Sequence, residues 1–239
     1  MGSPFCVIRK SLLSGAQQAQ GLAVVIDVLR AFTSAAFMVY LGAKEILLLA
    51  EPEAVLKLKG AEGTLAVGEV DGNMVPGFDL GNSPAAILRA GPERFAGKVV
   101  AQRTSAGVIG AVAAAETAEQ VILGSYVTAG ATARHIRNQA RPGGRVTLIA
   151  MGSRGEERTP DDESCADYLE HLLTGRAYNH ATALRQIVAH ECTQKFLRAD
   201  QAHYPADDPI YCLQRDLFDF VLIARLEHGR LVARRVGVP

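Results

Sequence analysis

Short apolar runs alternate along this chain with alanine-rich segments of helical character, and this alternation restricts the possible folds most. The expected strands cover residues 5–9, 22–28, 45–49, 64–67, 98–101, 120–123 and 145–151. The expected helices cover residues 31–41, 52–59, a segment that opens at 83–84, and then 105–116, 126–140, 161–174 and 177–199. Strands that alternate with helices through short connections favour a mostly parallel sheet covered on both faces. We therefore expect an α/β fold of the αβα sandwich type.

The last part of the chain breaks this pattern. Residues 217–226 and 230–236 are rich in apolar residues and flank the turn His228-Gly229, which predicts a C-terminal β-hairpin. The chain shows neither a Ser/Pro-rich linker nor an internal repeat. We expect a single domain over residues 1–239, with the hairpin as an addition to it.

The charge balance excludes two large classes of partner. The 25 basic and 25 acidic residues cancel, so there is no overall attraction to nucleic acid or to an anionic membrane. The longest apolar region, residues 22–43, contains Asp27 and Arg30, which a membrane span would not tolerate cheaply. The four cysteines have no metal-binding spacing, and unpaired thiols are typical of the cytoplasm. We expect a cytoplasmic protein with a small-molecule partner.

Ligands of parallel α/β sheets bind beyond the carboxyl ends of the strands. The segment after strand 22–28 carries Asp27 and Arg30. The carboxylate is a candidate ligand for Mg²⁺, and the guanidinium is a candidate clamp for a phosphate or sulfonate. The alternative is an internal salt bridge between the two side chains.

The loop over residues 68–83 is long for a strand-to-helix connection, and long loops are often functional. Glu69 and Asp79 are candidate oxygen ligands for a metal, and Asn82 and Ser83 are candidate substrate contacts. The alternative is turn chemistry followed by a helix cap. For Ser83 the local pattern favours the cap.

Two further strand ends carry polar groups. Residues 103–107 offer a guanidinium, two hydroxyls and a helix N-terminus, which is a candidate phosphate seat, although no Walker A or GxGxxG motif is present. At residues 159–163, Thr159 is expected to cap a helix whose first turn contains Asp161 and Asp162. Either acid is alternatively a general base or a metal contact. We favour Asp162, because the third helical position points back toward the cap.

Taken together, these segments resemble the 2-phosphosulfolactate phosphatase family of coenzyme M biosynthesis. The matching segments are VVIDVLRAFTSA (24–35), GAKEI (42–46), GE (68–69), GFDLGNSP (77–84), GS (124–125), GSRGE (152–156) and DDESCA (161–166). Two departures are RTSAG at 103–107, where many members have a TTNGT-like stretch, and Cys165-Ala166-Asp167, where Cys-Ala-Gly is usual. The resemblance implies an αβα fold and Mg²⁺-dependent hydrolysis of a phosphate monoester on a small sulfonated hydroxy acid. It directs attention to Asp27, Arg30, Glu69, Asp79, Asn82 and Ser83.

The leading hypothesis is a Mg²⁺-dependent phosphatase that converts 2-phosphosulfolactate to sulfolactate and phosphate. Its expected catalytic residues are Asp27, Arg30, Asp161 and Asp162. Its expected metal ligands are Asp27, Glu69 and Asp79. Its expected substrate contacts are Arg30, Thr33, Asn82, Ser83, Arg103, Thr104, Ser105 and Gly107.

Several alternatives stay open. Attack by water is preferred over a covalent phosphate on Asp27, because Leu29 stands where aspartate-nucleophile phosphatases carry a second acid. The protein is alternatively a phosphatase with a different small substrate, or a non-catalytic protein that binds or senses a phosphorylated or sulfonated metabolite. A homodimer is a further possibility.

Overall fold

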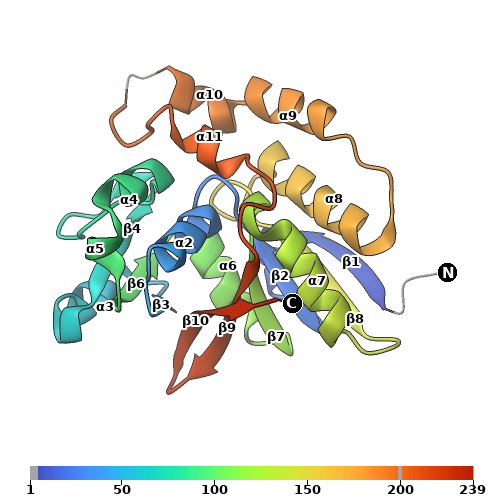
Figure 1. Ribbon diagram of the computed structural model, residues 1–239, viewed down its shortest axis with the longest axis horizontal. Coiled ribbons are helices and arrows are strands. Elements are labelled where there is room, and N and C mark those ends of the chain that lie inside the picture. The colour runs from blue at the N-terminus through green and yellow to red at the C-terminus, as the bar shows by residue number, and fades with distance from the viewer. Residues whose placement is uncertain (1–4, 199–200, 239) are drawn as a thin grey trace.

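The strands form one continuous sheet in the computed structural model, which describes residues 5–198 and 201–238 (Figure 1). The strands within this part of the chain are β1 (Cys6–Ser11), β2 (Leu22–Ile26), β3 (Glu45–Leu48), β4 (Leu65–Val70), β5 (Asn73–Met74), β6 (Val99–Arg103), β7 (Gln120–Gly124), β8 (Arg145–Ala150), β9 (Phe220–Glu227) and β10 (Arg230–Gly237). Their order across the sheet is β1-β8-β2-β7-β9-β10-β3-β6-β4-β5. All neighbours are parallel except those that involve β5, β9 or β10.

Helices cover both faces of the sheet. They are α1 (Leu12–Ala16), α2 (Ala31–Tyr40), α3 (Pro52–Leu58), α4 (Pro84–Ala90), α5 (Pro92–Phe95), α6 (Gly107–Ala114), α7 (Ala129–Gln139), α8 (Pro160–Thr174), α9 (His180–Ala189), α10 (Glu191–Leu197) and α11 (Asp208–Cys212), with short 3-10 turns η1 (Ala61–Gly63) and η2 (Tyr126–Thr128). In β2, Val25 packs with α2 and α6, whereas Val24 and Ile26 pack with α7 and α8. Because alternate side chains of a strand point to opposite faces, the two helix groups lie on opposite sides. The expected αβα sandwich is confirmed.

The C-terminal hairpin is also confirmed, but it lies in the middle of the sheet rather than at its margin. β9 and β10 pair along their whole length, and the turn residues His228 and Gly229 both have positive φ, as a tight hairpin turn requires. β9 pairs with β7 and β10 pairs with β3, over three residues each. The hairpin therefore joins two parallel half-sheets that have no other strand pairing between them among the described residues.

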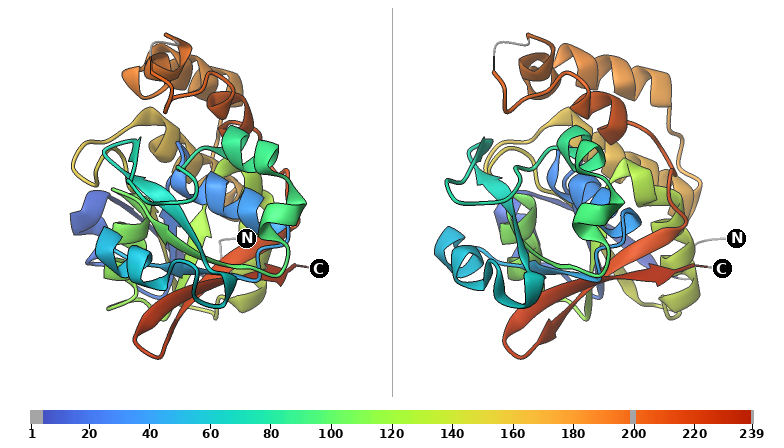
Figure 2. Two further views of the ribbon diagram at one scale, coloured as in Figure 1. Left: turned by 90° about the vertical axis from the view of Figure 1, so that its left-hand side faces the viewer. Right: turned by 60° about the vertical axis from the view of Figure 1, so that its left-hand side comes forward.

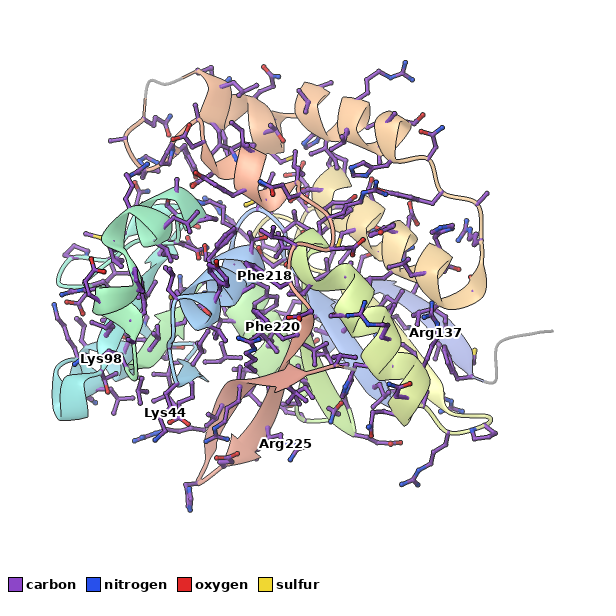
Figure 3. All side chains as sticks on the ribbon, viewed as in Figure 1. Lys44, Lys98, Arg137, Phe218, Phe220 and Arg225 are labelled. Atoms are coloured by element: carbon purple, nitrogen blue, oxygen red, sulfur yellow. The ribbon has the colours of Figure 1, made fainter. Side chains whose placement is uncertain are left out.

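Aromatic rings fix the base of this hairpin. Figure 3 labels Phe218 and Phe220, which lie where the chain enters β9, next to α2. Their rings stack with centroids 5.1 Å apart, and Phe218 meets Phe37 of α2 edge-on at 5.2 Å. Such pairs add to the stabilisation from apolar burial. The hairpin is thus anchored to the helix that follows Asp27.

The sheet curves enough to bring the carboxyl ends of its two halves together. Four strands separate β2 from β6 in the sheet order, yet the Gly107 amide, after β6, donates a 2.8 Å hydrogen bond to Asp27, after β2. Glycine is required at position 107, because a Cβ atom there would lie 2.7 Å from Oδ2 of Asp27. Both half-sheets therefore contribute to one site.

Helices α9, α10 and α11 form a layer over this carboxyl edge, at the end of the molecule opposite the hairpin tip (Figures 1 and 2). The single helix expected over residues 177–199 is two helices, and residue 199 lies outside the described residues. The break falls at His190, whose backbone is extended and whose Nδ1 accepts a 3.1 Å hydrogen bond from the Cys192 amide. Histidine thus caps α10, an interruption that the apolar pattern does not indicate.

The model contains no helix, within the residues it describes, that is both long and apolar enough to cross a bilayer. The cysteines of this part of the chain, Cys6, Cys165, Cys192 and Cys212, form no disulfide.

Candidate active site

A cavity of about 410 Å³ opens at the carboxyl edge of the sheet. Its walls come from the strand ends after β2, β4, β6 and β8 and from the helical layer around α10. Of the site residues that the sequence predicts, those that line the cavity are Asp27, Arg30, Glu69, Asn82, Ser105, Asp161 and Asp162. The structure therefore brings together residues that are up to 135 positions apart in the chain.

Asp27 is held rigidly at the base of the cavity. It follows β2 directly, and its carboxylate accepts hydrogen bonds from the backbone amides of Ala31 (2.9 Å) and Gly107 (2.8 Å). These amides belong to the first turns of α2 and α6, so the positive ends of two helices face the carboxylate. Asp27 is thus oriented by backbone that moves only if a helix moves.

Burial and neighbouring charge both act on Asp27. Burial raises its pKa to about 7, and the carboxylates of Asp161 and Glu69 add to the increase, whereas the two amide hydrogen bonds oppose it. Like charges that crowd a buried site favour either a proton or a cation. The acidic wall of the cavity is therefore a place where positive charge is stabilised.

The two acids at the start of α8 have different environments. Both oxygens of Asp162 accept backbone hydrogen bonds, from Val28 (2.7 Å) and Gly152 (2.8 Å), so this side chain ties β2 to the loop after β8. Burial raises the pKa of Asp162, with further contributions from Asp161 and Asp27. Asp161 accepts one long backbone bond, from the Leu29 amide at 3.3 Å. Its carboxylate also interacts with the thiol of Cys192 and, after burial, adds to the increase in the pKa of that thiol. Its Oδ1 is buried and has no partner within hydrogen-bond distance among the described residues.

The Asp161 oxygen is the clearest unsatisfied acceptor on the cavity wall. A buried carboxylate oxygen without a donor is costly, so such a group points to a ligand that the structure does not contain. Asn82 has the same feature, because its side-chain Oδ1 is buried and unpartnered within the described residues. The geometry therefore favours Asp161 over Asp162 as the functional acid, which reverses the preference based on helix position.

Glu69 orders the loop that follows β6. Its carboxylate accepts hydrogen bonds from the Ser105 amide (2.6 Å), the Ser105 hydroxyl (3.0 Å) and the Gly72 amide (2.6 Å). Glu69 lines the cavity, but its oxygens already have three donors. Its main visible role is to clamp two strand-end loops against each other.

Arg30 does not form the salt bridge with Asp27 that the sequence left open. Its Nη1 donates to Oδ2 of Asp208 at 2.9 Å and to the His203 carbonyl at 2.7 Å. Its guanidinium also lies over the rings of Phe196 and Tyr204, with the central carbon 5.2 and 5.1 Å from their centroids. The side chain is held by the helical layer and still reaches the cavity wall.

Several predicted substrate contacts make hydrogen bonds within the fold. The Thr33 hydroxyl donates to the Val28 carbonyl, Thr104 caps α6 by accepting from the Val108 amide, and Gly107 donates to Asp27. Arg103 donates to the carbonyls of Ala50 and Glu69 and to the Ser105 hydroxyl. None of these four residues lines the cavity.

Residues of the 68–83 loop divide in the same way. Ser83 caps α4 by accepting from the Ala86 amide (3.1 Å), as the local pattern favoured, and donates to Asp208 (2.7 Å). Asp79 lies away from the cavity, in a separate depression, where it pairs with Arg94 (3.1 Å) and Lys59 (3.4 Å). Asp79 is therefore not among the residues that line the cavity with Asp27 and Glu69.

At the start of α8, the backbone position of Thr159 is that of an N-cap, but its hydroxyl makes no capping hydrogen bond. The expected stabilisation by this side chain is therefore absent. Thr159 instead lines the cavity beside the two acids.

The helical layer contributes lining residues that the strand ends do not predict. His190, Cys192, Lys195, Phe196 and Tyr204 all line the cavity. They follow no strand of the parallel sheet, so a search of strand ends could not find them. The only local signal is the mixture of basic and aromatic residues around position 195, which is common on surface helices.

The acidic wall offers carboxylates to a magnesium ion but not a complete set of protein ligands. Among the described residues, no three His, Cys, Asp or Glu side chains are arranged as a complete metal site. Mg²⁺, however, is usually bound by one or two carboxylates together with waters and substrate phosphate. The crowded acids around Asp27 and the unpartnered oxygen of Asp161 meet that requirement.

The fold is of the α/β class, and its charged cavity at the carboxyl edge of the sheet has the features of an enzyme site for a small anion. A family model described as 2-phosphosulpholactate phosphatase matches residues 7–227. The chain therefore belongs to the 2-phosphosulfolactate phosphatase family, whose members are phosphoric monoester hydrolases.

Three relatives illustrate the similarity, and each carries the name "Probable 2-phosphosulfolactate phosphatase". The Bacillus subtilis protein is 30% identical over 201 residues, which cover 83% of this chain and 85% of the relative. The Deinococcus radiodurans protein is 37% identical over 153 residues, or 64% of this chain and 62% of the relative. The Clostridium perfringens (strain 13) protein is 27% identical over 235 residues, or 91% of this chain and 90% of the relative.

Proposed function

We propose that this protein hydrolyses 2-phosphosulfolactate to sulfolactate and phosphate, in a reaction that depends on Mg²⁺. The observation that supports this most is the opposition of acids and cations in one cavity at the carboxyl edge of the sheet. The relatives' names supply the substrate. A phosphate monoester with a second acid group matches a site that carries both kinds of charge.

Asp27 is the residue that would hold the metal, and Asp161 lies close to it. Both line the cavity, both are buried, and the charge of Asp161 adds to the increase in the pKa of Asp27. When bound, Mg²⁺ would neutralise charge on the phosphoryl oxygens and lower the pKa of a bound water. Glu69 supports this arrangement from the neighbouring loop and adds negative charge near Asp27.

The protein's own groups have distinct tasks in this scheme. The unpartnered Oδ1 of Asp161 orients the attacking water and accepts its proton. The guanidinium of Arg30, which lines the cavity, donates to the substrate anion, while Asp208 and the ring faces fix its orientation. The helical layer excludes bulk water and so strengthens these interactions.

A covalent phosphate on Asp27 is the mechanistic rival. Both Asp27 oxygens already accept backbone hydrogen bonds, which suits a fixed ligand better than a nucleophile that changes its bonding. Acid quenching during turnover followed by hydroxylamine treatment measures any acyl phosphate. We expect none, and a trapped phosphoenzyme would establish the covalent route.

The deciding experiment measures phosphate release from 2-phosphosulfolactate with and without chelator. We expect hydrolysis with Mg²⁺, its loss in EDTA, and its return when Mg²⁺ is added back. Full activity in the chelated protein would remove the metal from the proposal. Tight binding of 2-phosphosulfolactate without phosphate release would favour the non-catalytic binding or sensing protein instead, and release only from other esters would favour a different substrate.

Coenzyme M biosynthesis as the pathway and the cytoplasm as the location stay predictions, from the resemblance and from the unpaired cysteines respectively. A homodimer is likewise a prediction that equilibrium sedimentation tests.

A further inference from the structure

One wall of the cavity is cationic and aromatic and comes from the helical layer. Lys195 and Phe196 belong to α10, and Tyr204 follows it in the chain. The Lys195 ammonium lies 4.7 Å from the Tyr204 ring centroid and 5.5 Å from that of Phe196. Arg30 uses the same two rings, so two cations share one aromatic pair.

The two cations differ in their partners. Arg30 is neutralised by the fully buried carboxylate of Asp208. Lys195 has neither an ion pair nor a hydrogen bond to any residue that the structure describes, although it is half-buried. Burial and the nearby Arg30 lower the pKa of Lys195. The charges of Asp161 and Glu69 oppose this decrease, and an anion that enters the cavity would stabilise the ammonium further.

Tyr204 holds this wall in place. Its hydroxyl packs against Gly72 so closely that a Cβ atom at position 72 would lie 1.9 Å from it, and Gly72 has a φ of +83°. The Gly72 amide in turn donates to Glu69. The aromatic platform under Lys195 is therefore joined to the acidic loop, which keeps the cationic wall at a fixed position relative to the acids.

We propose that Lys195 is a specificity-determining residue, whose ammonium binds the second acid group of the substrate, its sulfonate or carboxylate, while the acidic wall takes the phosphoryl group. This inference rests on the proposed function for the identity of the substrate. It predicts that the enzyme selects phosphate monoesters that carry a further anionic group over simple alkyl phosphates. Lys195 then contributes to substrate affinity and not to the chemistry at phosphorus.

The test compares three esters with the wild type and with Lys195→Met, which keeps the length of the side chain and removes its charge. The esters are 2-phosphosulfolactate, 2-phospholactate, which lacks the sulfonate, and isopropyl phosphate, which lacks both acid groups. For 2-phosphosulfolactate we expect kcat/KM to fall by about 10- to 100-fold, mainly through KM, because a charge-assisted hydrogen bond is lost. For isopropyl phosphate we expect a change of less than about threefold, because it has no group for Lys195 to bind.

The result with 2-phospholactate shows which acid group of the substrate Lys195 contacts. An equal loss with 2-phospholactate assigns Lys195 to the carboxylate, and a loss only with 2-phosphosulfolactate assigns it to the sulfonate. Equal losses on all three esters would overturn the proposal, since Lys195 would then act on the phosphoryl group. Unchanged kinetics on all three would overturn it as well.

Two further variants exclude a general effect of the substitution. Lys195→Arg keeps the charge and should recover part of the lost kcat/KM, which a purely structural role would not require. Lys57→Met removes a lysine from the exposed surface of α3 and should leave all three substrates unaffected. Melting temperatures of the variants identify any that is misfolded, and Lys195→Gln then replaces Lys195→Met.

A binding measurement separates this inference from the proposed function. Calorimetric titration with sulfolactate, which has no phosphate, requires no turnover. We expect the Kd to rise at least about tenfold in Lys195→Met. If the wild type hydrolyses none of the esters but binds sulfolactate, and Lys195→Met binds it more weakly, the phosphatase proposal fails and the Lys195 site stands. Equal sulfolactate binding by both proteins would overturn the Lys195 site even if hydrolysis is confirmed.

Discussion

The two neighbouring acids of α8 show how much the role of a residue depends on its hydrogen bonds. Asp161 and Asp162 share a helical turn and a cavity, and helix position alone favours Asp162. Asp162 accepts two backbone amides that connect separate strand ends, whereas Asp161 keeps a buried oxygen without a donor. One acid stabilises the walls and the other is available to a ligand.

This difference predicts opposite phenotypes for two isosteric substitutions. Asp161→Asn should lower kcat by roughly 10²-fold or more and leave the melting temperature nearly unchanged. Asp162→Asn should lower the free energy of unfolding by about 1–3 kcal/mol, because an amide nitrogen replaces one of two acceptors. Steady-state kinetics and thermal melts on both variants measure the contrast. Unchanged kcat in Asp161→Asn would return the functional assignment to Asp162.

Asp27 predicts a pH dependence of stability in the metal-free protein. Its pKa is about 7 in the folded state and about 4 in an unfolded chain, so the folded protein holds an extra proton between these values. Stability therefore falls as the pH rises through this interval, and the loss is complete above the folded-state pKa. One pKa unit corresponds to about 1.4 kcal/mol, so the melting temperature in EDTA should be several degrees lower at pH 8 than at pH 5.

Two variants attribute this effect to Asp27. Asp27→Asn cannot ionise and should weaken the dependence, leaving the part that the raised pKa of Asp162 contributes. Asp219→Asn, whose side chain is 84% exposed, should leave the dependence as in the wild type. Mg²⁺ added at pH 8 should raise the melting temperature of the wild type, since a ligand of the folded state stabilises it. An Asp27→Asn protein with the wild-type pH dependence would assign the effect to another acid.

At the scale of elements, two helix caps differ in the hydrogen bonds that they make beyond their own helix. Ser83 caps α4 and also donates to Asp208, the partner of Arg30. Asn179 caps α9 by accepting from the Thr182 amide and is exposed, with no described link to the cavity. One cap is part of the support of the anion site, and the other stabilises a helix only.

Alanine substitutions at the two caps separate these roles. Asn179→Ala should cost about 1 kcal/mol of stability and leave KM unchanged. Ser83→Ala should cost about 2 kcal/mol, because the buried Asp208 also loses a donor, and should raise KM through a less ordered Arg30. Equal KM values in the two variants would exclude the proposed relay through Asp208.

The whole molecule depends on the C-terminal hairpin. Val232 of β10 is buried and pairs with β3, whereas Val236 of the same strand is partly exposed and lies beyond the residues paired with β3. Val232→Asp places an unpaired charge inside the sheet, at a cost of roughly several kcal/mol, and should abolish cooperative unfolding. Val236→Asp should fold normally. Denaturant titrations followed by circular dichroism measure both, and a stable Val232→Asp protein would contradict a central role for the hairpin.

Sequence predicted the fold class because the strand and helix patterns have different periods and because turn chemistry marks the hairpin. It did not predict the position of the hairpin, since pairing partners far apart in the chain leave no local signal. In the site, strand ends indicated Asp27, Arg30, Glu69 and the α8 acids. Lys195 and Tyr204 were not found, because tertiary packing of α10, and not a motif, brings them to the cavity. Asp79 and Arg103 have the same residue types as residues that line the cavity, and only their position, ion pairs and hydrogen bonds distinguish them.

The central place of β9 and β10 has a consequence for synthesis on the ribosome. β7 and β3, the strands that the hairpin joins, are translated long before it, so each half-sheet keeps an unpaired inner edge while translation continues. Exposed edges recruit other strands, including those of neighbouring nascent chains. A product that terminates before residue 220 would retain both edges permanently, and cells would have to shield it with chaperones or degrade it.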